Sequence, residues 1–183
     1  MKKVYLFLAY GFEEVEALTT VDLLRRAGAE VITVSVSSSN AVTGSHKIPV
    51  ITDIKIDESA FDDADAIVLP GGLPGVDNLK ACAKLSEIIK KNYEAGKYIC
   101  AICAAPMVLG GLGLLKGRKA TSYPGCEAAL EGAILSEDRV CVDGNIITSR
   151  GVGTAIDFAS EIIKVLEGSE KAAEVRKNIL ADL

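Results

Sequence analysis

Histidine is nearly absent from this sequence, and tryptophan is missing altogether. Among 183 residues there is one histidine, His46, in a Gly-Ser-His-Lys stretch. Histidine is the side chain that most often acts as a general base or a metal ligand near neutral pH. A single copy therefore excludes most mechanisms that pair a histidine with a motif elsewhere in the chain. From the residues alone, we interpret His46 as an ordinary surface side chain in a turn.

The sequence also lacks a long apolar run and an excess of positive charge. No apolar stretch approaches the roughly 20 residues of a membrane-spanning helix. Residues 1–10 superficially resemble a signal peptide, but they run into Gly11-Phe12-Glu13-Glu14 without a small-residue cleavage site. We expect them to form the first strand of a cytoplasmic protein. The formal net charge of −5 argues against a basic nucleic-acid-binding surface.

Cofactor motifs are missing as well. The chain has neither the Gly-x-Gly-x-x-Gly fingerprint of dinucleotide sites nor the Gly-Lys-Ser/Thr of phosphate-binding loops. Five cysteines are an odd number, which is not typical of a disulfide framework. Cys100 and Cys103 form one Cys-x-x-Cys pair, but Cys100 lies inside an apolar run and no second pair completes a zinc site. We expect no cofactor and no metal.

Alternating apolar runs and amphipathic stretches predict the fold class. Continuous apolar segments, typical of strands buried on both faces, occupy residues 3–8, 30–36, 66–69 and 98–103. Helical spacing occupies residues 13–27, 79–95, 153–166 and 169–180. This order predicts a mostly parallel, doubly wound α/β sheet with helices on both faces.

Three shorter segments complete the predicted arrangement. Residues 140–148 contain Asp-Gly-Asn between two β-branched runs, which predicts a hairpin. Residues 119–122 predict a further strand. Residues 42–52, interrupted by Pro49, predict short strands on an excursion from the central sheet. With no linker or repeat in view, we expect one domain over residues 1–183.

Glycine-rich or reactive segments directly follow three of the predicted strands. They are residues 11–16, residues 70–75 and Cys103. Ligand sites in open α/β sheets form outside the carboxyl ends of the strands. We therefore expect these three segments to meet in space and to form the functional site.

Cys103 is the candidate nucleophile. It ends an apolar run and precedes Ala104-Ala105-Pro106, a pattern typical of a sharp turn between a strand and a helix. Such a turn lifts the sulfur out of the sheet, and the start of a helix favours the thiolate. The alternative is a small buried hydrophobic side chain. The turn, the small neighbours and the facing glycine loop favour the nucleophile.

Glu16 is the candidate partner of this thiol. Glu13 and Glu14 are explained by their place at the start of a helix, whereas Glu16 lies one turn in, between apolar residues. A carboxyl held near a thiolate has its pKa raised and can donate a proton; surface capping is the alternative. Gly71 and Gly72 offer backbone N–H groups that would stabilise an oxyanion, unless they serve a tight turn alone.

These motifs resemble those of the ThiJ/PfpI superfamily, in the branch typified by the parkinsonism-associated deglycase. The matching segments occur in family order along nearly the whole chain: residues 11–16 (GFEEVE), 21–28 (VDLLRRAG), 68–72 (VLPGG), 101–106 (AICAAP) and 148–154 (TSRGVGT). The resemblance implies a flavodoxin-like three-layer sandwich that assembles as a homodimer. It also implies that Cys103 is reactive and is prone to oxidation to the sulfinate.

The resemblance gives roles to the residues around Cys103. Glu16 matches a protonated glutamate that hydrogen-bonds the sulfur. Gly72 and Ala104 match the backbone donors of an anion pocket. Glu13 matches a carboxylate of the substrate pocket.

More distant residues are matched too, with two departures. Arg26 and Arg150 fall at family positions near the site or the dimer contact. His46 stands where the human member has an arginine that approaches the site across the dimer. Tyr123, in Ser-Tyr-Pro, replaces a histidine that the human member has near its cysteine. The substrate pocket implied by the resemblance therefore contains Glu13, His46 and Tyr123.

Histidines that other branches require are missing. The protease branch has a histidine directly after its cysteine, where this chain has Ala104. The related amidotransferases need a late histidine, and none follows His46. We therefore expect neither a protease nor an amidotransferase.

Two functions fit the remaining chemistry. In the first, Cys103 adds to small reactive carbonyls such as glyoxal or methylglyoxal, or to their early adducts on amines and thiols, as a glyoxalase or deglycase does. In the second, the chain is a redox sensor or redox-regulated chaperone of the oxidative-stress response, and peroxide oxidises Cys103 to a sulfinate. The sequence does not decide between them.

Overall fold

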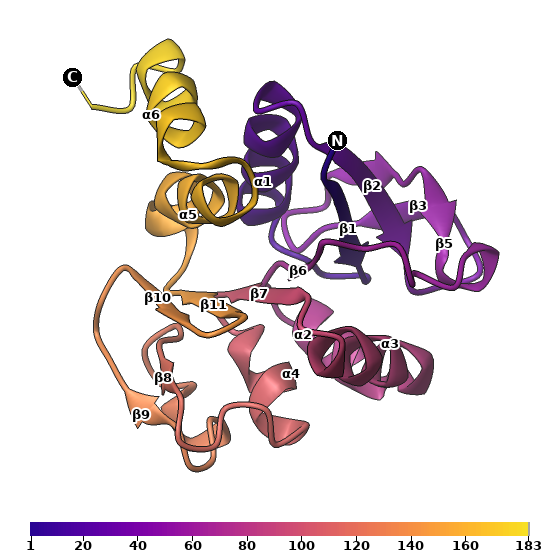
Figure 1. Cartoon of the computed structure of the whole chain (residues 1–183). Helices are drawn as coiled ribbons and strands as arrows, with labels where there is room; N and C mark the ends of the chain where they lie inside the picture. The colour runs from indigo at the N-terminus through magenta and orange to yellow at the C-terminus, as the bar shows by residue number, and fades with distance from the viewer. Residues whose placement is uncertain (183) are drawn as a thin grey trace.

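A seven-stranded sheet forms the centre of the computed structural model, which describes residues 1–182 (Figure 1). The strand order is β10-β11-β7-β6-β1-β2-β5. These strands are β1 (Lys3–Leu8), β2 (Glu30–Ser35), β5 (Ile54–Lys55), β6 (Ala66–Leu69), β7 (Tyr98–Ile102), β10 (Val140–Asp143) and β11 (Ile146–Ser149). Neighbours pair in parallel except β10 and β11, which form the predicted antiparallel hairpin. The mostly parallel sheet is thus confirmed.

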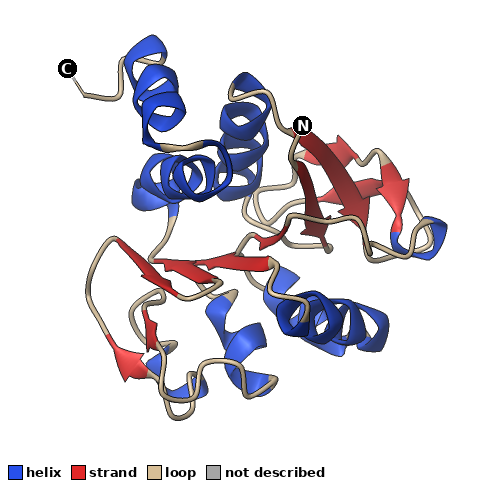
Figure 2. Cartoon of the chain, viewed as in Figure 1, coloured by secondary structure: helices blue, strands red, loops and turns tan. Residues whose placement is uncertain are grey.

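Helices cover both faces of this sheet and give the predicted flavodoxin-like, three-layer arrangement (Figure 2). One side carries α1 (Glu14–Arg26) and α5 (Ala155–Glu167), with α6 (Ser169–Asn178) packed on α5. The other side carries α2 (Gly75–Ala81), α3 (Ala83–Glu94) and α4 (Pro106–Gly111). Three single 3₁₀ turns are η1 (Ile56–Glu58), η2 (Glu127–Ala129) and η3 (Val152–Thr154).

The apolar run of β1 contributes to two cores at once. Val4 and Leu6 pack into the core beneath α1 and α5, whereas Tyr5 and Phe7 pack into the core beneath α2 and α3. Successive side chains of a strand point to opposite faces, so a strand covered on both sides needs apolar residues at every position. This is why the run is continuous rather than alternating.

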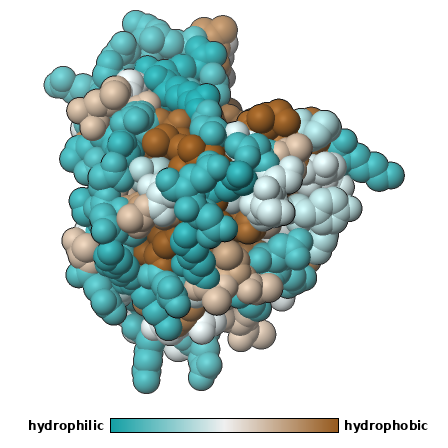
Figure 3. Space-filling model, turned by 90° about the vertical axis from the view of Figure 1, so that its right-hand side faces the viewer, coloured by the Kyte–Doolittle hydropathy of each residue, from teal (hydrophilic) through white to brown (hydrophobic). Residues whose placement is uncertain are grey.

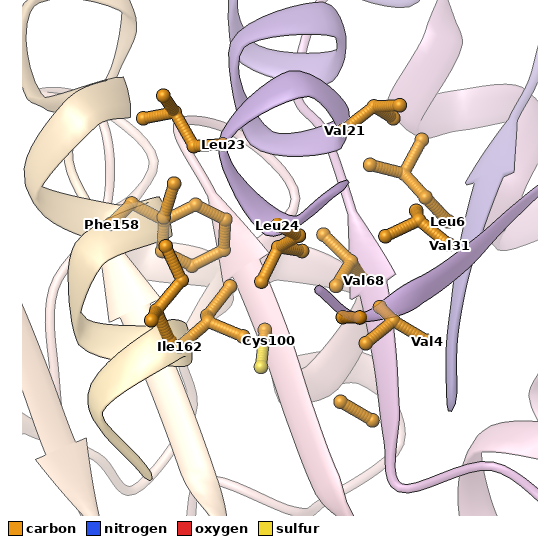
Figure 4. Packing of buried hydrophobic residues seen from close by; sticks show 14 of the residues in the cluster. Val4, Leu6, Val21, Leu23, Leu24, Val31, Val68, Cys100, Phe158 and Ile162 are labelled. Carbon is orange, nitrogen blue, oxygen red and sulfur yellow. The ribbon is translucent and has the colours of Figure 1, made fainter. Parts of the chain in front are cut away.

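The core between α1, α5 and the sheet also contains Cys100. Leu24 of α1 and Phe158 and Ile162 of α5 pack with Val68 and Cys100 in this core (Figure 4). Cys100 is fully buried, and burial raises the pKa of its thiol. Its role is that of a small apolar side chain, and it shares no pocket with Cys103.

One predicted helix is wrong in its bounds. The predicted segment 79–95 is in fact two helices, because α2 begins at Gly75 and the chain is extended at Cys82, where α3 starts. The break lets the two helices pack in different places. α2 lies against β1 and α4, and α3 lies against β7. One straight helix would not make both sets of contacts.

Two small sheets lie outside the central one. The excursion predicted at residues 42–52 is confirmed as a hairpin of β3 (Ala41–Thr43) and β4 (Pro49–Ile51). The strand predicted at residues 119–122 is shorter, since β8 (Lys119–Ala120) pairs only with β9 (Ile134–Leu135) among the described strands. Thr121 cannot extend it, because its N–H donates to the Thr148 hydroxyl at 3.0 Å.

The surface mixes polar and apolar side chains. On the face shown in Figure 3, apolar residues form separate patches between hydrophilic ones. Within residues 1–182, none of the helices has both the length and the apolar character that crossing a membrane requires.

Candidate functional site

Cys103 lies at a sharp bend between β7 and α4, as predicted. Its φ is +66°, in the left-handed region that costs a side-chain-bearing residue about 1–3 kcal/mol. Two backbone hydrogen bonds hold the bend: the Cys103 N–H donates to the Ser149 carbonyl at 3.0 Å, and its carbonyl accepts from the Tyr123 N–H at 2.8 Å. The sulfur is thereby presented at the carboxyl edge of the sheet.

Glu16 reaches this edge from the first turn of α1 and is fully buried. Its Oε2 accepts a hydrogen bond from the Gly71 N–H at 2.8 Å, while its Oε1 has no hydrogen-bond partner among residues 1–182. Burial raises the pKa of Glu16 to about 7, against the hydrogen bonds from Gly71 and Cys103. The structure places Glu16 at the cavity with a raised pKa, but the cause is burial rather than the neighbouring thiol, whose hydrogen bond lowers the pKa.

The prediction that a helix start lowers the thiol pKa is wrong. Burial, followed by the charge of Glu16, raises the pKa of Cys103 to about 12, although the N–H groups of Ala104 and Gly72 act in the opposite direction. α4 is six residues long and begins only at Pro106. Two buried acids in contact disfavour a second negative charge, so the thiol keeps its proton near neutral pH while Glu16 titrates there.

The glycine loop after β6 divides its N–H groups between these two acids. Gly72 and, from the bend, Ala104 hydrogen-bond the Cys103 sulfur. Gly71 was also a candidate oxyanion donor, but its N–H is taken by Glu16. Gly72 has a φ of +92°, and a Cβ there would lie 2.4 Å from the Glu13 nitrogen, so only glycine fits.

A cavity of about 580 Å³ opens over the sulfur. It is bounded by the start of α1, the loop after β6, the bend at Cys103 and the turn that follows β11. Seven of the predicted site residues line it: Glu13, Glu16, His46, Gly72, Cys103, Tyr123 and Arg150. The carboxyl ends of the strands therefore do meet here, as expected for an open α/β sheet.

His46 lies at the rim of the cavity, in the same chain as Cys103. Its Nδ1 is 2.9 Å from Glu14 Oε2 and 3.8 Å from Glu13 Oε1. The hydrogen bond with Glu14 raises the pKa of His46. One potential ligand atom from each of Glu13, Glu14 and His46 lies within 4.8 Å of the other two. Among the described residues, this is the group whose geometry could hold a metal ion. Glu14 already accepts from the His46 N–H and the Ser45 hydroxyl, so we interpret the group as an ion pair.

Two predicted residues contribute less than expected. Tyr123 forms part of the cavity wall but is 53% exposed. Arg26 is not at the cavity: it is the last residue of α1, and its Nε is 2.7 Å from Asp22 Oδ2. A role of Arg26 at a dimer contact stays a prediction.

Two other residues in the cavity wall, Arg139 and Thr154, are not among those predicted from the sequence. Arg139 donates to Asp157 and to the Gly153 carbonyl, both at 2.7 Å. The Thr154 hydroxyl hydrogen-bonds the Gly151 carbonyl at 2.9 Å and thereby shapes the turn. Thr154 lies in a recognised motif, but nothing in the spacing indicated its contacts; Arg139 carries no motif at all.

Comparisons with known proteins agree with this geometry. The model of the DJ-1/PfpI family matches residues 2–165. "Protein DJ-1 homolog A" of Arabidopsis thaliana is 42% identical over 182 residues, which are 98% of this chain but 46% of that protein, so the chain spans less than half of it. "Glutathione-independent glyoxalase DJR-1.2" of Caenorhabditis elegans is 34% identical, covering 90% of this chain and 88% of that protein. The solved structure "Toxoplasma gondii DJ-1, oxidized" is 39% identical, with a TM-score of 0.95 and 98% of both chains covered. The chain therefore belongs to the DJ-1/PfpI family.

Proposed function

We propose that this chain detoxifies small reactive carbonyls: it converts 2-oxoaldehydes such as methylglyoxal, or their early adducts on amines and thiols, into 2-hydroxy acids. One observation carries the proposal. Glu16 is fully buried beside a cavity-facing thiol, with Oε1 unpartnered among residues 1–182 and a pKa raised by burial to about 7. Such a carboxyl both takes and returns protons near neutral pH. The name of the Caenorhabditis elegans relative supports the same chemistry.

Each step moves a proton that Glu16 can carry. The Cys103 sulfur attacks the aldehyde carbon, and Glu16 takes the thiol proton and passes it to the carbonyl oxygen, giving a hemithioacetal. Gly72 and Ala104 offer N–H groups for the charge on that oxygen. Glu16 then removes the proton from the same carbon and returns it to the neighbouring ketone carbon, while the hydroxyl proton of the hemithioacetal moves to the ketone oxygen. The former aldehyde is thereby oxidised to a thioester and the ketone is reduced to an alcohol. Water hydrolyses the thioester, which frees the hydroxy acid and the thiol.

Formation of lactate from methylglyoxal is the direct test. We expect Cys103→Ser to reduce the rate to background and Glu16→Gln to reduce it at least about a hundredfold, since proton transfer by a positioned side chain contributes 10²–10⁴. The wild-type rate should rise with pH through the Glu16 pKa of about 7, because the carboxylate form removes protons.

The matched control is Cys82→Ser, which changes a thiol outside the cavity, at the junction of α2 and α3. It should keep the wild-type rate. Equal lactate formation by the wild type, Cys103→Ser and Glu16→Gln would rule this mechanism out.

A redox sensor is the second candidate, favoured by the donors around the sulfur. The N–H groups of Gly72 and Ala104 and the carboxyl of Glu16 surround Cys103, and they would hold the oxygens of a sulfinate. The solved Toxoplasma gondii relative is described as oxidized. We expect mild peroxide to add two oxygens to Cys103 before it modifies Cys82. Oxidation of Cys82 with Cys103 still reduced would exclude the sensor.

We further propose a homodimer. Val15 and Leu18, one turn apart on the outer face of α1, are apolar yet 46% and 40% exposed. Exposed apolar side chains on one helix face favour a contact with a second copy. Sedimentation at twice the chain mass would support the dimer, and sedimentation at the chain mass would contradict it.

A further inference from the structure

Arg150 occupies a place between two cavities. It follows β11 directly and is half-buried. One side of the Arg150 residue lines the 580 Å³ cavity over Cys103. The other contributes to a neighbouring cavity of about 250 Å³, which is lined by Thr121 and Ser122. The proposed reaction gives Arg150 no step.

Arg150 differs from every other arginine of the chain. The other five each form an ion pair with an aspartate: Arg25 with Asp53, Arg26 with Asp22, Arg118 with Asp143, Arg139 with Asp157, and Arg176 with Asp157 and Asp182. Within residues 1–182 no carboxylate oxygen lies within 4.0 Å of the Arg150 guanidinium, and the one hydrogen bond that Arg150 donates there comes from its backbone N–H. Within residues 1–182, the guanidinium of this half-buried residue therefore has no hydrogen-bond or ion-pair partner.

Four acidic side chains line the two cavities; Glu13, Glu16 and Glu127 accept backbone hydrogen bonds, and the fourth, Glu137, forms no ion pair with Arg150 within residues 1–182. On the thiol side, Glu13 accepts the Glu16 N–H at 2.8 Å and lies near His46. Glu16 accepts the Gly71 N–H. On the far side, Glu127 accepts the Gly125 N–H at 2.6 Å. None of these four carboxylates forms an ion pair with the Arg150 guanidinium within the described residues.

A free guanidinium at a thiol cavity selects for one kind of ligand. Its planar fork matches the two oxygens of a carboxylate, and charge-assisted pairs of this kind are the stronger hydrogen bonds. The proposed reaction turns a neutral aldehyde into a carboxylate in this cavity. The substrate therefore enters the cavity as a neutral aldehyde, and the product carries a negatively charged carboxylate at the same carbon.

We propose that Arg150 is the carboxylate-binding residue of the Cys103 cavity, and that it holds small 2-hydroxy and 2-oxo acids there. The link to 2-hydroxy acids rests on the proposed function, but the binding site itself needs no turnover. Lactate and its relatives then act as competitive ligands of the site.

Two alkylating reagents test the site without any catalysis. Iodoacetate and iodoacetamide form the same S–C bond and release the same iodide, but only iodoacetate carries a carboxylate. The ratio of their rates at one thiol cancels the fraction of thiolate, so changes in the pKa of Cys103 do not affect it. Peptide mass spectrometry measures the extent of alkylation at Cys103, Cys82 and Cys126 in one sample. Cys82 and Cys126 are also partly exposed and serve as internal references.

We expect the iodoacetate-to-iodoacetamide ratio at Cys103 to exceed that at Cys82 and Cys126 about tenfold, the size of one charge-assisted contact. Arg150→Gln should bring it to the reference value, and Arg150→Lys should restore part of it. Lys90→Gln is the matched control: it removes one exposed positive charge from α3 and should change nothing. Lactate should slow iodoacetamide labelling of Cys103 in the wild type and not in Arg150→Gln.

The proposal fails if the wild-type ratio at Cys103 equals the reference ratios, or if Arg150→Gln leaves it unchanged. It also fails if Lys90→Gln lowers it as much, since net charge would then be the cause. Unaltered circular dichroism and unaltered labelling of Cys82 establish that a variant is folded. A protein that forms no lactate but keeps the Arg150-dependent ratio would disprove the proposed function and leave this site standing.

Discussion

Replacing Glu16 with glutamine is expected to stabilise the fold at pH 8 and to leave its stability at pH 4 nearly unchanged. Burial raises the pKa of this carboxyl from 4.5 in the unfolded chain to about 7 in the fold. Between these values the folded protein binds more protons than the unfolded chain, so stability falls as the pH rises. Above about pH 7 the loss is complete, and it amounts to at most about 3 kcal/mol at 1.36 kcal/mol per pH unit.

Glutamine removes this loss because it has the shape of a protonated glutamate and no charge. Its amide oxygen can still accept the Gly71 N–H that Oε2 accepts in the wild type. At pH 4 the wild-type carboxyl is protonated in both states, so the variants should then agree. Urea unfolding of both proteins at pH 4 and pH 8 gives the two differences directly.

Glu14→Gln is the matched control, with the opposite sign. Glu14 is also buried in the first turn of α1, but the hydrogen bonds from His46 and the backbone outweigh burial and lower its pKa. Its charge stabilises the fold above pH 4.5 and ceases to do so as the pH falls through its folded pKa. Glu14→Gln should therefore be less stable than the wild type at pH 8. A Glu16→Gln protein that is no more stable than the wild type at pH 8 would contradict the raised pKa.

This contrast explains why a buried carboxyl without a cation beside it points to function. Evolution retains a group that weakens the fold where activity depends on it, and stability and activity then trade against each other. Glu14 and Glu16 are two positions apart on one helix, and they have similar burial. Of the two, only Glu16 reaches the thiol cavity, and only Glu16 has a pKa raised by burial.

The parts of the fold that follow from local pattern could be predicted from the sequence. The bounds of β1 and β6 agree with the apolar runs at residues 3–8 and 66–69, because strands covered on both faces need uninterrupted apolar residues. The hairpin turn contains Asp-Gly-Asn, and Gly144 has the positive φ that such a turn favours. The bend at Cys103 follows from small residues and a proline after an apolar run.

Features that depend on contacts between distant segments could not be predicted. Nothing at Cys82 marks the break between α2 and α3, since the break serves packing against different partners. The acceptor of the Gly71 N–H is Glu16, which is 55 positions away in the sequence, so this hydrogen bond depends on the tertiary fold. The high pKa of Cys103 depends on burial by the assembled cavity, which outweighs the local effect of a helix start.

Gly71→Ala is expected to disrupt the thiol site through the bulk of a single methyl group. A Cβ at Gly71 would lie 2.6 Å from the Cys103 Cβ, 2.7 Å from Glu16 Oε2 and 3.0 Å from the Ile102 carbonyl oxygen. The backbone of Gly71 is not in the left-handed region, so the effect is purely steric. Overpacking of this kind costs about 1–3 kcal/mol. A displacement of about 1 Å between catalytic groups lowers turnover about a hundredfold.

The matched control is Gly111→Ala, at the exposed last residue of α4. A Cβ there meets no atom within 4 Å, and its φ is also outside the left-handed region. Alanine has the higher helix propensity, so this variant should be as stable as the wild type or slightly more stable. Urea unfolding and the rate of Cys103 alkylation measure both variants. Gly71 holds Glu16 through its N–H and leaves room for the sulfur through its missing side chain. Wild-type values for both measurements in Gly71→Ala would mean that the thiol and the carboxyl do not depend on this close approach.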